Sequence, residues 1–435
     1  MNPRMTALRL LLRYEEDGAY PNLLLSEKSA GEGDARDRAF LTTLLYGTVE
    51  HKLTLDYAIA CYTENPADKL TAHTRALLRM GLYQVFYLDR VPAFAAVHET
   101  VALAAHKGEA SLLNGVLRHA VRDGRPPLPP REKNPARYLS VAMSFPLATV
   151  KRFIALFGEK ATEDILRCYN EAPRITLRIN TMKTTRAAYL RLLAENGIAA
   201  EEVTYAPFGV RLAESCDPTG LPGFADGVFF VQDEASQIAG AALAPEEGAK
   251  VLDLCACPGG KSFSAAMYMR DTGEILACDL HASKLPLVKT GADRLGLTAI
   301  HTMEHDATEP LAGADGIYDC VIADVPCSGL GVLGKKPDLR YADPARFSIL
   351  PPLQAAILDR AAAYVRPGGV LLYSTCTLLP EENEERVRAF LDDHRDFIPE
   401  PFSVGALTAE TGMVTLFPHI HRTDGFFIAR MRRKD

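Results

Sequence analysis

The chain has 435 residues, about three times the commonest domain size of roughly 100–150 residues, which predicts several domains and excludes a single small fold. Hydrophobic residues make up 48% and charged residues 24% of the sequence, and these ordinary globular values exclude an intrinsically disordered chain. The formal net charge of −7 by itself argues weakly against a nucleic-acid partner, because phosphate binding depends on basic surface.

The first 125 residues are predicted to be helical throughout. Apolar residues recur at helical spacing, as in Leu77, Leu78 and Leu82, and no strand-like alternation interrupts them. Prolines then crowd residues 126–137, where they cannot continue a helix and act as a stiff spacer. The sequence therefore predicts a helical domain at 1–125 that is followed by a proline-rich linker at 126–137.

The rest of the chain predicts two further modules. Residues 138–240 combine strand-like runs with an amphipathic helix, which is typical of a small α+β module. Residues 241–435 alternate strand and helix and end in a strand-like run, DGFFIARMRR. Alternation of this kind predicts an α/β domain with a doubly wound, Rossmann-like parallel sheet.

The cysteines and the N-terminus indicate the compartment. Nine cysteines without tight spacing argue against a disulfide framework and favour a reducing environment. The N-terminal segment lacks the apolar core and the cleavage site of a signal peptide, and no segment approaches the roughly 18 consecutive apolar residues of a membrane span. We expect a cytoplasmic protein that does not enter a membrane.

A glycine loop opens the predicted α/β domain. In VLDLCACPGGKS a hydrophobic strand leads into Gly259 and Gly260 and then into a helix, so a ligand can approach the backbone and the free N–H groups of the helix. The pattern is neither G-x-x-x-x-G-K-[ST] nor G-x-G-x-x-G, and without context such a turn is more often only a tight turn. Asp279 ends the next predicted strand, where a carboxylate can accept both hydroxyls of a ribose. A nucleoside-binding site is therefore favoured, with a loop made of Cys255, Ala256, Cys257, Pro258, Gly259, Gly260 and Lys261.

Two acids and two cysteines follow further strand ends. Asp306 and Asp324 lie at the carboxyl edge of the predicted sheet, where open α/β sheets bind ligands. Cys327 lies in the same loop as Asp324, and Cys376 follows the strand GVLLYST. A lone cysteine is usually a buried, inert residue, but two at successive strand ends favour a shared crevice.

Three motifs carry a resemblance to a known family: CACPGGK (255–261), DVPCSGLG (324–331) and YSTCTLLPEENE (373–384). RIN (178–180) and KKPDLR (335–340) add weaker support. With these motifs the chain resembles, essentially from end to end, the NOL1/NOP2/Sun family of RNA cytosine-C5 methyltransferases in its bacterial 16S ribosomal RNA branch, and its first domain resembles the NusB-type RNA-binding fold. The resemblance implies S-adenosylmethionine as cofactor and 16S ribosomal RNA as partner. The chain departs from the family at Cys257, where alanine is usual, and at 144–146, where Ser-Phe-Pro replaces the common Ser-His-Pro.

The resemblance also implies catalytic roles. Carbon 5 of cytosine is a poor nucleophile, so a thiolate must first add to carbon 6. By similarity to the family, Cys376 is this nucleophile and Cys327 assists release of the methylated product. Asp324 is expected to hydrogen-bond the polar edge of the cytosine, and Lys261 or the donors around it to lower the pKa of the attacking thiol.

The methyl donor is expected across the strand ends, with the 255–261 loop beneath it. In this arrangement Asp279 lies on the ribose, Asp306 near the adenine and Asp324 near the methionine end. No metal site is expected, because the Cys255-x-Cys257 pair lacks a second Cys or His pair at ligand spacing. The enzyme is expected to act as a monomer.

Positive charge gathers in a few places of this acidic chain. We expect the basic stretch from Arg118 to Arg137, together with Arg178, Lys335 and Lys336, to contact RNA phosphates.

Two alternatives stay open. A non-catalytic RNA-binding or transcription factor would explain residues 1–125 but would leave the donor loop and both cysteines without a purpose. The same chemistry on transfer RNA or another RNA is not excluded by the sequence. A NAD oxidoreductase is disfavoured by the missing third glycine and by the cysteine pair.

Overall fold

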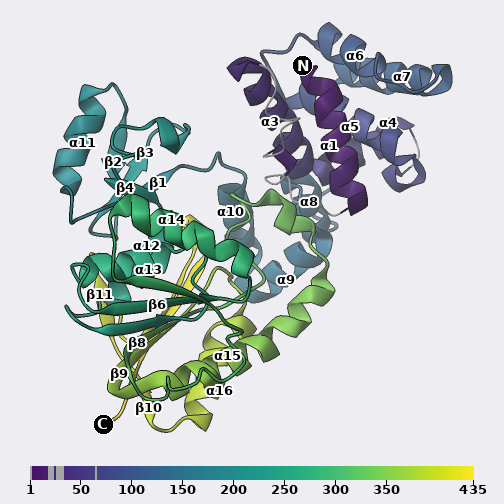
Figure 1. Ribbon diagram of the computed structural model, residues 1–435. Coiled ribbons are helices and arrows are strands. Elements are labelled where there is room, and N and C mark those ends of the chain that lie inside the picture. The colour runs from purple at the N-terminus through teal and green to yellow at the C-terminus, as the bar shows by residue number, and fades with distance from the viewer. Residues whose placement is uncertain (1, 18–23, 26–33, 64–65) are drawn as a thin grey trace. The chain divides into compact units, whose positions relative to one another are not determined.

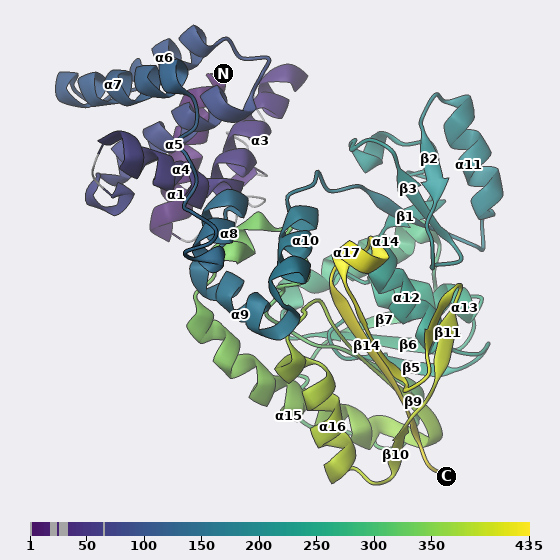
Figure 2. The ribbon, with the colours of Figure 1, turned by 180° about the vertical axis from the view of Figure 1, so that it is seen from behind.

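The computed structural model describes residues 2–17, 24–25, 34–63 and 66–435, which form two compact units (Figure 1, Figure 2). The first, here called the helical unit, comprises Met1–Asn170 and Leu333–Ala342. The second, the sheet unit, comprises Glu171–Val332 and Asp343–Asp435. Among the described residues no helix has the length and apolarity needed to cross a membrane.

Helices make up the helical unit, as the sequence predicts. They are α1 (Pro3–Asp17), α3 (Ala35–Glu50), α4 (Lys52–Thr63), α5 (Ala72–Tyr87), α6 (Ala93–Val101), α7 (Lys107–Asp123), α8 (Pro135–Met143), α9 (Leu147–Phe157) and α10 (Glu159–Tyr169). Side-chain caps fix several starts: the carboxylate of Asp34 accepts from the N–H of Asp37 before α3, and the hydroxyl of Thr71 accepts from the N–H of Thr74 before α5. Leucines of α3, α5 and α7 pack in a common core.

Helix α8 begins inside the predicted proline-rich linker. The side chain of Asn134 accepts from the N–H of Arg137, and Pro135 occupies the first turn, where a missing N–H costs nothing. The hydroxyl of Thr54 in α4 then donates to the carbonyl of Val141 at 2.6 Å. The helical unit thus continues to Asn170, beyond the proline-rich segment 126–137 at which the sequence predicted the first domain boundary.

The segment Leu333–Ala342 returns from much later in the chain to complete the helical unit. The side chain of Arg340 is fully buried, lies 4.0 Å above the ring of Phe145 and donates to the carbonyl of Tyr169 at 2.9 Å. The hydroxyl of Tyr341 donates to the carbonyls of Glu50 and Ser144. Phe145, where the related motif has histidine, is thus a buried packing residue.

A small antiparallel sheet opens the sheet unit. It contains β1 (Thr176–Ile179), β2 (Ala200–Glu202), β3 (Gly209–Leu212) and β4 (Phe229–Val231) in the order β2-β3-β1-β4. Helix α11 (Arg186–Glu195) packs on it through Tyr189 and Leu193.

A larger sheet carries the rest of the unit. Its parallel strands are β5 (Lys250–Asp253), β6 (Glu274–Asp279), β7 (Ile300–Glu304), β8 (Tyr318–Asp324) and β9 (Val365–Thr375), and its antiparallel strands include β10 (Phe397–Pro399), β13 (Met413–Leu416) and β14 (Phe426–Arg433). The order is β10-β14-β9-β8-β5-β6-β7, with β13 on β14. Strands β11 (Phe402–Val404) and β12 (Leu407–Ala409) pair separately, and the short helix α17 (Pro418–His421) precedes β14. The predicted Rossmann-like sheet and its terminal strand are confirmed.

Helices cover both faces of this sheet (Figure 1). Helices α12 (Glu234–Leu243), α13 (Gly260–Tyr268) and α14 (Leu285–Leu295) pack on one face, and α15 (Leu350–Tyr364) and α16 (Glu384–Asp393) on the other. Successive residues of a strand point to opposite faces of the sheet. Val251 packs in the core with α12, α13 and α14, and Leu252 packs in the core with α15 and α16. The strand ends are thereby left as the open edge of the sheet.

Candidate active site

The carboxyl ends of four strands meet at one edge of the large sheet, because these strands are parallel neighbours. Asp253 ends β5, Asp279 ends β6 and Asp324 ends β8. Cys376 directly follows β9. The predicted acids and the second cysteine thus come from the one edge at which such sheets bind ligands.

The glycine loop between β5 and α13 is held close to the sheet. The N–H of Ala256 donates to the carbonyl of Cys278 at 2.8 Å, and the N–H of Gly259 donates to the carbonyl of Ala256 at 2.7 Å. Gly259 has φ +112°, and a Cβ atom there would lie 2.4 Å from the ring of Phe263. Only glycine fits this turn, which leads directly into the first residue of α13.

A cavity of about 220 Å³ lies beside this loop. Its lining contains the predicted residues Cys255, Ala256, Cys257, Pro258, Gly260, Lys261 and Asp324. It also contains residues that the sequence analysis missed: Val231, Gln232, Asp233, Ser236 and Asp253. The small sheet and the start of α12 therefore contribute one wall of a cavity whose other wall is the glycine loop.

Asp253 is the most informative of the missed residues. Its side chain is fully buried, and its Oδ2 accepts a hydrogen bond from the hydroxyl of Ser262 at 2.7 Å. Its Oδ1 has no hydrogen-bond partner among the described residues. Burial raises the pKa of this carboxyl to about 7. A buried acceptor requires a donor, and a ligand with N–H or O–H groups would supply one at the cavity wall.

A network of hydrogen bonds connects the glycine loop to β8 and β9. Lys261, which is almost buried, donates to Asp324 Oδ2 at 2.5 Å, and the hydroxyl of Ser374 donates to Asp324 Oδ1 at 2.6 Å. Both oxygens of Asp324 are thereby occupied, and the ammonium of Lys261 is neutralised by this carboxylate. Lys261 consequently fixes Asp324 and lies 5.1 Å from the centre of the Phe426 ring.

The two predicted cysteines lie side by side. Their Sγ atoms are 3.1 Å apart, and the N–H of Cys376 points at Cys327 Sγ at 3.2 Å. Both are free thiols of intermediate exposure. The hydrogen bond with Cys376, burial and the charges of Cys376 and Glu382 hold the pKa of Cys327 well above its usual value. Cys327 is therefore held as a neutral thiol.

Two residues that were predicted to contact the methyl donor, Asp279 and Asp306, do not line this cavity. Asp279 Oδ1 accepts from the N–H of His281 at 3.0 Å, and burial followed by the charge and hydrogen bond of Asp279 raises the pKa of Cys257 to about 12. Asp306 is exposed, and its carboxylate accepts from the N–H and the hydroxyl of Thr308, which lowers its pKa. The departure at Cys257 thus places a neutral thiol beside Asp279.

Arg178 does not belong to an RNA-binding surface, and this prediction is wrong. Arg178 is only 2% exposed. Its guanidinium lies 4.4 Å from the centre of the Phe208 ring and 5.4 Å from the centre of the Tyr268 ring. Burial lowers the pKa of Arg178 to about 10. The sequence pattern RIN gave no sign that its arginine packs beneath two aromatic rings.

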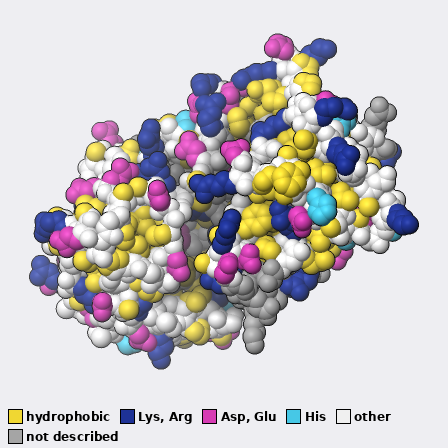
Figure 3. Space-filling model, turned by 90° about the horizontal axis from the view of Figure 1, so that it is seen from above, with side chains coloured by type: hydrophobic (Ala, Val, Ile, Leu, Met, Phe, Trp, Pro, Cys, Tyr) yellow, Lys and Arg dark blue, Asp and Glu magenta, His cyan; other side chains and the backbone are white. Residues whose placement is uncertain are grey.

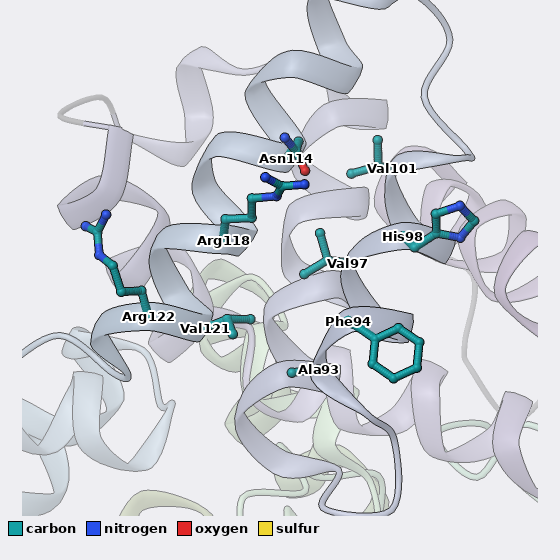
Figure 4. A pocket seen from close by; sticks show the side chains of 9 residues that line it. All are labelled: Ala93, Phe94, Val97, His98, Val101, Asn114, Arg118, Val121 and Arg122. Carbon is teal, nitrogen blue, oxygen red and sulfur yellow. The ribbon is translucent and has the colours of Figure 1, made fainter.

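Arginines of the predicted basic stretch differ in their accessibility. Arg131 pairs with Glu159 and Glu163, each at 2.7 Å. Basic side chains alternate with acidic ones on the face shown in Figure 3, so charge density alone does not mark a binding surface. Arg118 and Arg122 line an open groove of about 380 Å³ between α6 and α7 (Figure 4), and Arg122 also pairs with Asp123 at 2.7 Å.

The groove combines an apolar floor with a cationic rim. It is lined by Ala93, Phe94, Val97, His98, Val101, Asn114, Arg118, Val121 and Arg122. The residue Phe94 is 78% exposed, although it is a large apolar side chain. In Figure 4 the guanidinium of Arg118 lies near the amide of Asn114, across the groove from α6.

The doubly wound sheet, the glycine loop and the cavity at its strand ends form a Rossmann-like ligand-binding domain, and the family model that matches it is that of a methyltransferase. Family models agree: "16S rRNA methyltransferase RsmB/F" matches residues 240–432, "NusB family" matches 1–122, and "Methyltr_RsmF/B-like, ferredoxin-like domain" matches 145–219. The expected NusB-like helical domain and small α+β module are thereby confirmed. In the described residues no group of three or more His, Cys, Asp or Glu is arranged to hold a metal ion.

Whole-chain relatives narrow the family. A Bacillus subtilis chain named "Probable ribosomal RNA small subunit methyltransferase B" is 40% identical over 446 residues, covering 99% of this chain and 98% of its own. The solved structure of PH0851 is similar with a TM-score of 0.81 at 25% identity, covering 100% of this chain and 99% of its own. The structure of NSun6 from Pyrococcus horikoshii with SFG shares the fold, with a TM-score of 0.59 at 22% identity over 66% of this chain and 97% of its own. The chain belongs to the ribosomal RNA small subunit methyltransferase B family.

Proposed function

We propose that this protein transfers a methyl group from S-adenosylmethionine to carbon 5 of a cytosine in 16S ribosomal RNA, through a covalent bond between Cys376 and carbon 6. The substrate class follows from the names of its relatives. The observation that carries the chemistry is the pair of thiols 3.1 Å apart at the strand ends, beside Asp324. A single methyl transfer to a nucleophilic atom would need no such pair.

The cavity beside the glycine loop fits the methyl donor. Asp253 presents a buried acceptor without a partner among the described residues, and Gly260 leaves its backbone open on the same wall. We assign the loop 255–261 and Asp253 to donor binding, with Asp279 on the ribose hydroxyls and Asp306 on the adenine side. When bound, S-adenosylmethionine supplies an electrophilic methyl group at the strand ends.

Cys376 begins the reaction as a thiolate. Its sulfur forms a bond to carbon 6 of the cytosine, and the electron pair of the 5,6 double bond moves towards carbon 5, which becomes nucleophilic. Once carbon 5 carries the methyl group, its proton must leave. The electron pair of that C–H bond then reforms the double bond, and the bond between carbon 6 and Cys376 breaks to return the thiolate.

Cys327 is suited to accept this departing proton. Its pKa is raised chiefly by its hydrogen bond with Cys376. After attack the sulfur of Cys376 is a thioether without a negative charge, so this cause is removed; Cys327 then releases its own proton to solvent and, as a thiolate, accepts the proton of carbon 5. In this proposal the contact with Cys376 keeps Cys327 protonated until carbon 6 has been attacked.

Asp324 and Lys261 support the base while it carries the added charge. The carboxylate of Asp324 is fixed by Lys261 and Ser374, so it can hydrogen-bond the polar edge of cytosine without reorienting. The ammonium of Lys261 acts through Asp324, whose carboxylate it holds in place. All residues of this proposed site come from one chain, which is compatible with action as a monomer in the cytoplasm.

The groove of the helical unit is suited to bind a single-stranded part of the RNA. Arg118 and Arg122 can contact phosphates, and the exposed ring of Phe94 can stack on an unpaired base. Such contacts supply affinity that does not depend on the target base, whose extrusion from a stack costs a few kcal/mol.

The proposed function is tested with purified protein, S-adenosylmethionine and protein-free 16S ribosomal RNA, followed by bisulfite sequencing. One newly protected cytosine that requires both protein and donor is expected. Transfer RNA and 23S ribosomal RNA serve as controls, and protection only in one of these would contradict the assigned substrate.

A further inference from the structure

A buried carboxylate links the two cysteine loops. Glu382 lies in the short helix Pro380–Glu382 after β9 and is 1% exposed. Its Oε2 accepts from the N–H of Ser328, the residue after Cys327, at 2.9 Å, and from Gln354 Nε2 at 2.8 Å. Gln354 Nε2 also donates to the carbonyl of Pro326, the residue before Cys327, at 2.9 Å. Glu382 therefore holds the Cys327 loop directly at Ser328 and, through Gln354, at Pro326.

The neighbouring residue holds the other loop. Asn383 accepts from the hydroxyl of Thr375 at 2.6 Å and donates to the carbonyl of Thr377 at 3.0 Å, so it spans both neighbours of Cys376. The hydroxyls of Ser328 and Thr377 lie 2.7 Å apart and join the two loops directly. The backbone of Glu382 is itself fixed, because its carbonyl accepts from the hydroxyl of Tyr373 at 2.6 Å.

The charge of Glu382 acts on the same pair. It is one of the causes that raise the pKa of Cys327, after the contact with Cys376 and burial. Its second oxygen, Oε1, is buried and has no hydrogen-bond partner among the described residues. A glutamine at this position would offer the same acceptor to Ser328 without burying an uncompensated charge. The hydrogen bonds that hold the Cys327 loop therefore do not by themselves explain why the residue is a glutamate.

We propose that Glu382 is a positioning residue for the methyl-transfer reaction, which fixes the Cys327 loop against the Cys376 loop so that Cys327 stays beside Cys376. This assignment rests on the proposed function. Cys376 is the other titratable group that acts on Cys327, and Tyr373, on which the charges of Cys327 and Glu382 act, is also influenced by Arg386 and Asp324. Glu382 differs from them because it also holds the Cys327 loop in place.

Two variants test the charge of Glu382 separately from the hydrogen bonds that hold the Cys327 loop. Glu382→Gln keeps an acceptor for Ser328 and removes the charge, whereas Gln354→Leu removes the hydrogen bonds of Gln354 to Pro326 and to Glu382 and keeps the charge. Glu385→Gln, an exposed acid on α16, is the matched control. Alkylation of Cys327 by iodoacetamide, followed by mass spectrometry across a pH series, reports its thiolate without RNA or donor.

We expect Glu382→Gln to alkylate Cys327 about tenfold faster at neutral pH, with the profile shifted to lower pH, while Gln354→Leu and Glu385→Gln keep the wild-type profile. With donor and RNA, Gln354→Leu should lose turnover and accumulate a protein–RNA adduct, because the release step needs the placed Cys327, whereas Glu382→Gln, which keeps the acceptor for Ser328, should accumulate less adduct than Gln354→Leu. Thermal denaturation and donor binding confirm folding. If Glu382→Gln leaves the alkylation profile unchanged and Gln354→Leu leaves the adduct level unchanged, Glu382 is only structural and the proposal is wrong. If wild-type protein neither methylates RNA nor forms an adduct, while the alkylation shift persists, the proposed function fails but the effect of Glu382 on Cys327 stands.

Discussion

The protonation of Asp253 should make binding of the methyl donor depend on pH. Burial raises the pKa of this carboxyl from 3.8 to about 7, a difference of about three units, which corresponds to about 4 kcal/mol against the charged form. Ser262 and Lys261 favour the carboxylate, whereas Asp324 opposes it. S-adenosylmethionine carries positive charge, so it should bind the ionised form preferentially. We expect its affinity to rise up to about tenfold per pH unit below about pH 7 and to level off above it.

The measurement is calorimetric titration of the donor between about pH 5.5 and 8.5. Asp253→Asn should bind the donor more weakly above pH 7 and should lose the pH dependence, and Glu385→Gln, which changes an exposed acid of α16, should keep it. Without donor the sign for folding is opposite. Because the folded state holds this proton more tightly than the unfolded chain, the contribution of Asp253 to the free energy of unfolding is greatest below pH 3.8 and is lost as the pH rises through about 7. Asp253→Asn should therefore gain stability relative to wild type above pH 7. Equal pH dependence in wild type and Asp253→Asn would refute the reasoning.

Three further predictions concern other parts of the molecule. Asp279→Ala should weaken donor binding about tenfold or more, since each lost hydrogen bond contributes roughly 0.5–1.5 kcal/mol, and more with a charged acceptor; unchanged affinity by calorimetry would remove Asp279 from the donor site. Arg118→Ala and Arg122→Ala should each reduce the slope of log affinity for RNA against log salt by about one, while Arg36→Ala, an exposed arginine of α3, serves as control and retains the wild-type slope in filter binding. Arg340→Ala should lower the free energy of unfolding by roughly 2–3 kcal/mol, because it removes the stack on Phe145 and the charged hydrogen bond to Tyr169; urea denaturation that matches the exposed control Lys336→Ala would show that this contact contributes little.

The alternation of strand and helix was enough to predict the large sheet, because burial on both faces gives each parallel strand a continuous apolar run. The meeting of the two cysteines also follows from the fold. Asp324 and Ser374 are register partners in the β8–β9 pair, so the loops that follow them start side by side. Motif spacing predicts such meetings when both residues follow neighbouring strands.

The residues that the sequence analysis missed come from elsewhere in the chain. Gln232 and Asp233 reach the cavity from the small sheet, and no periodicity indicates that this module forms a wall of a donor cavity. Asp253 was visible as an acid at the end of an apolar strand, but its unpartnered oxygen depends on three-dimensional packing. Arg178 was misjudged for a related reason, since a basic residue next to apolar ones can as well be buried under aromatic rings.

The central claim, that Cys376 attacks and Cys327 serves release, is tested most directly by one denaturing gel. Wild type, Cys376→Ala and Cys327→Ala are incubated with labelled 16S ribosomal RNA and S-adenosylmethionine and are then denatured before electrophoresis. We expect a protein–RNA adduct to accumulate with Cys327→Ala, because addition proceeds while elimination is slow, and no adduct with Cys376→Ala, which lacks the nucleophile. An adduct seen only with Cys376→Ala would reverse the two roles, and a fully active Cys376→Ala without any adduct would contradict covalent catalysis by this residue.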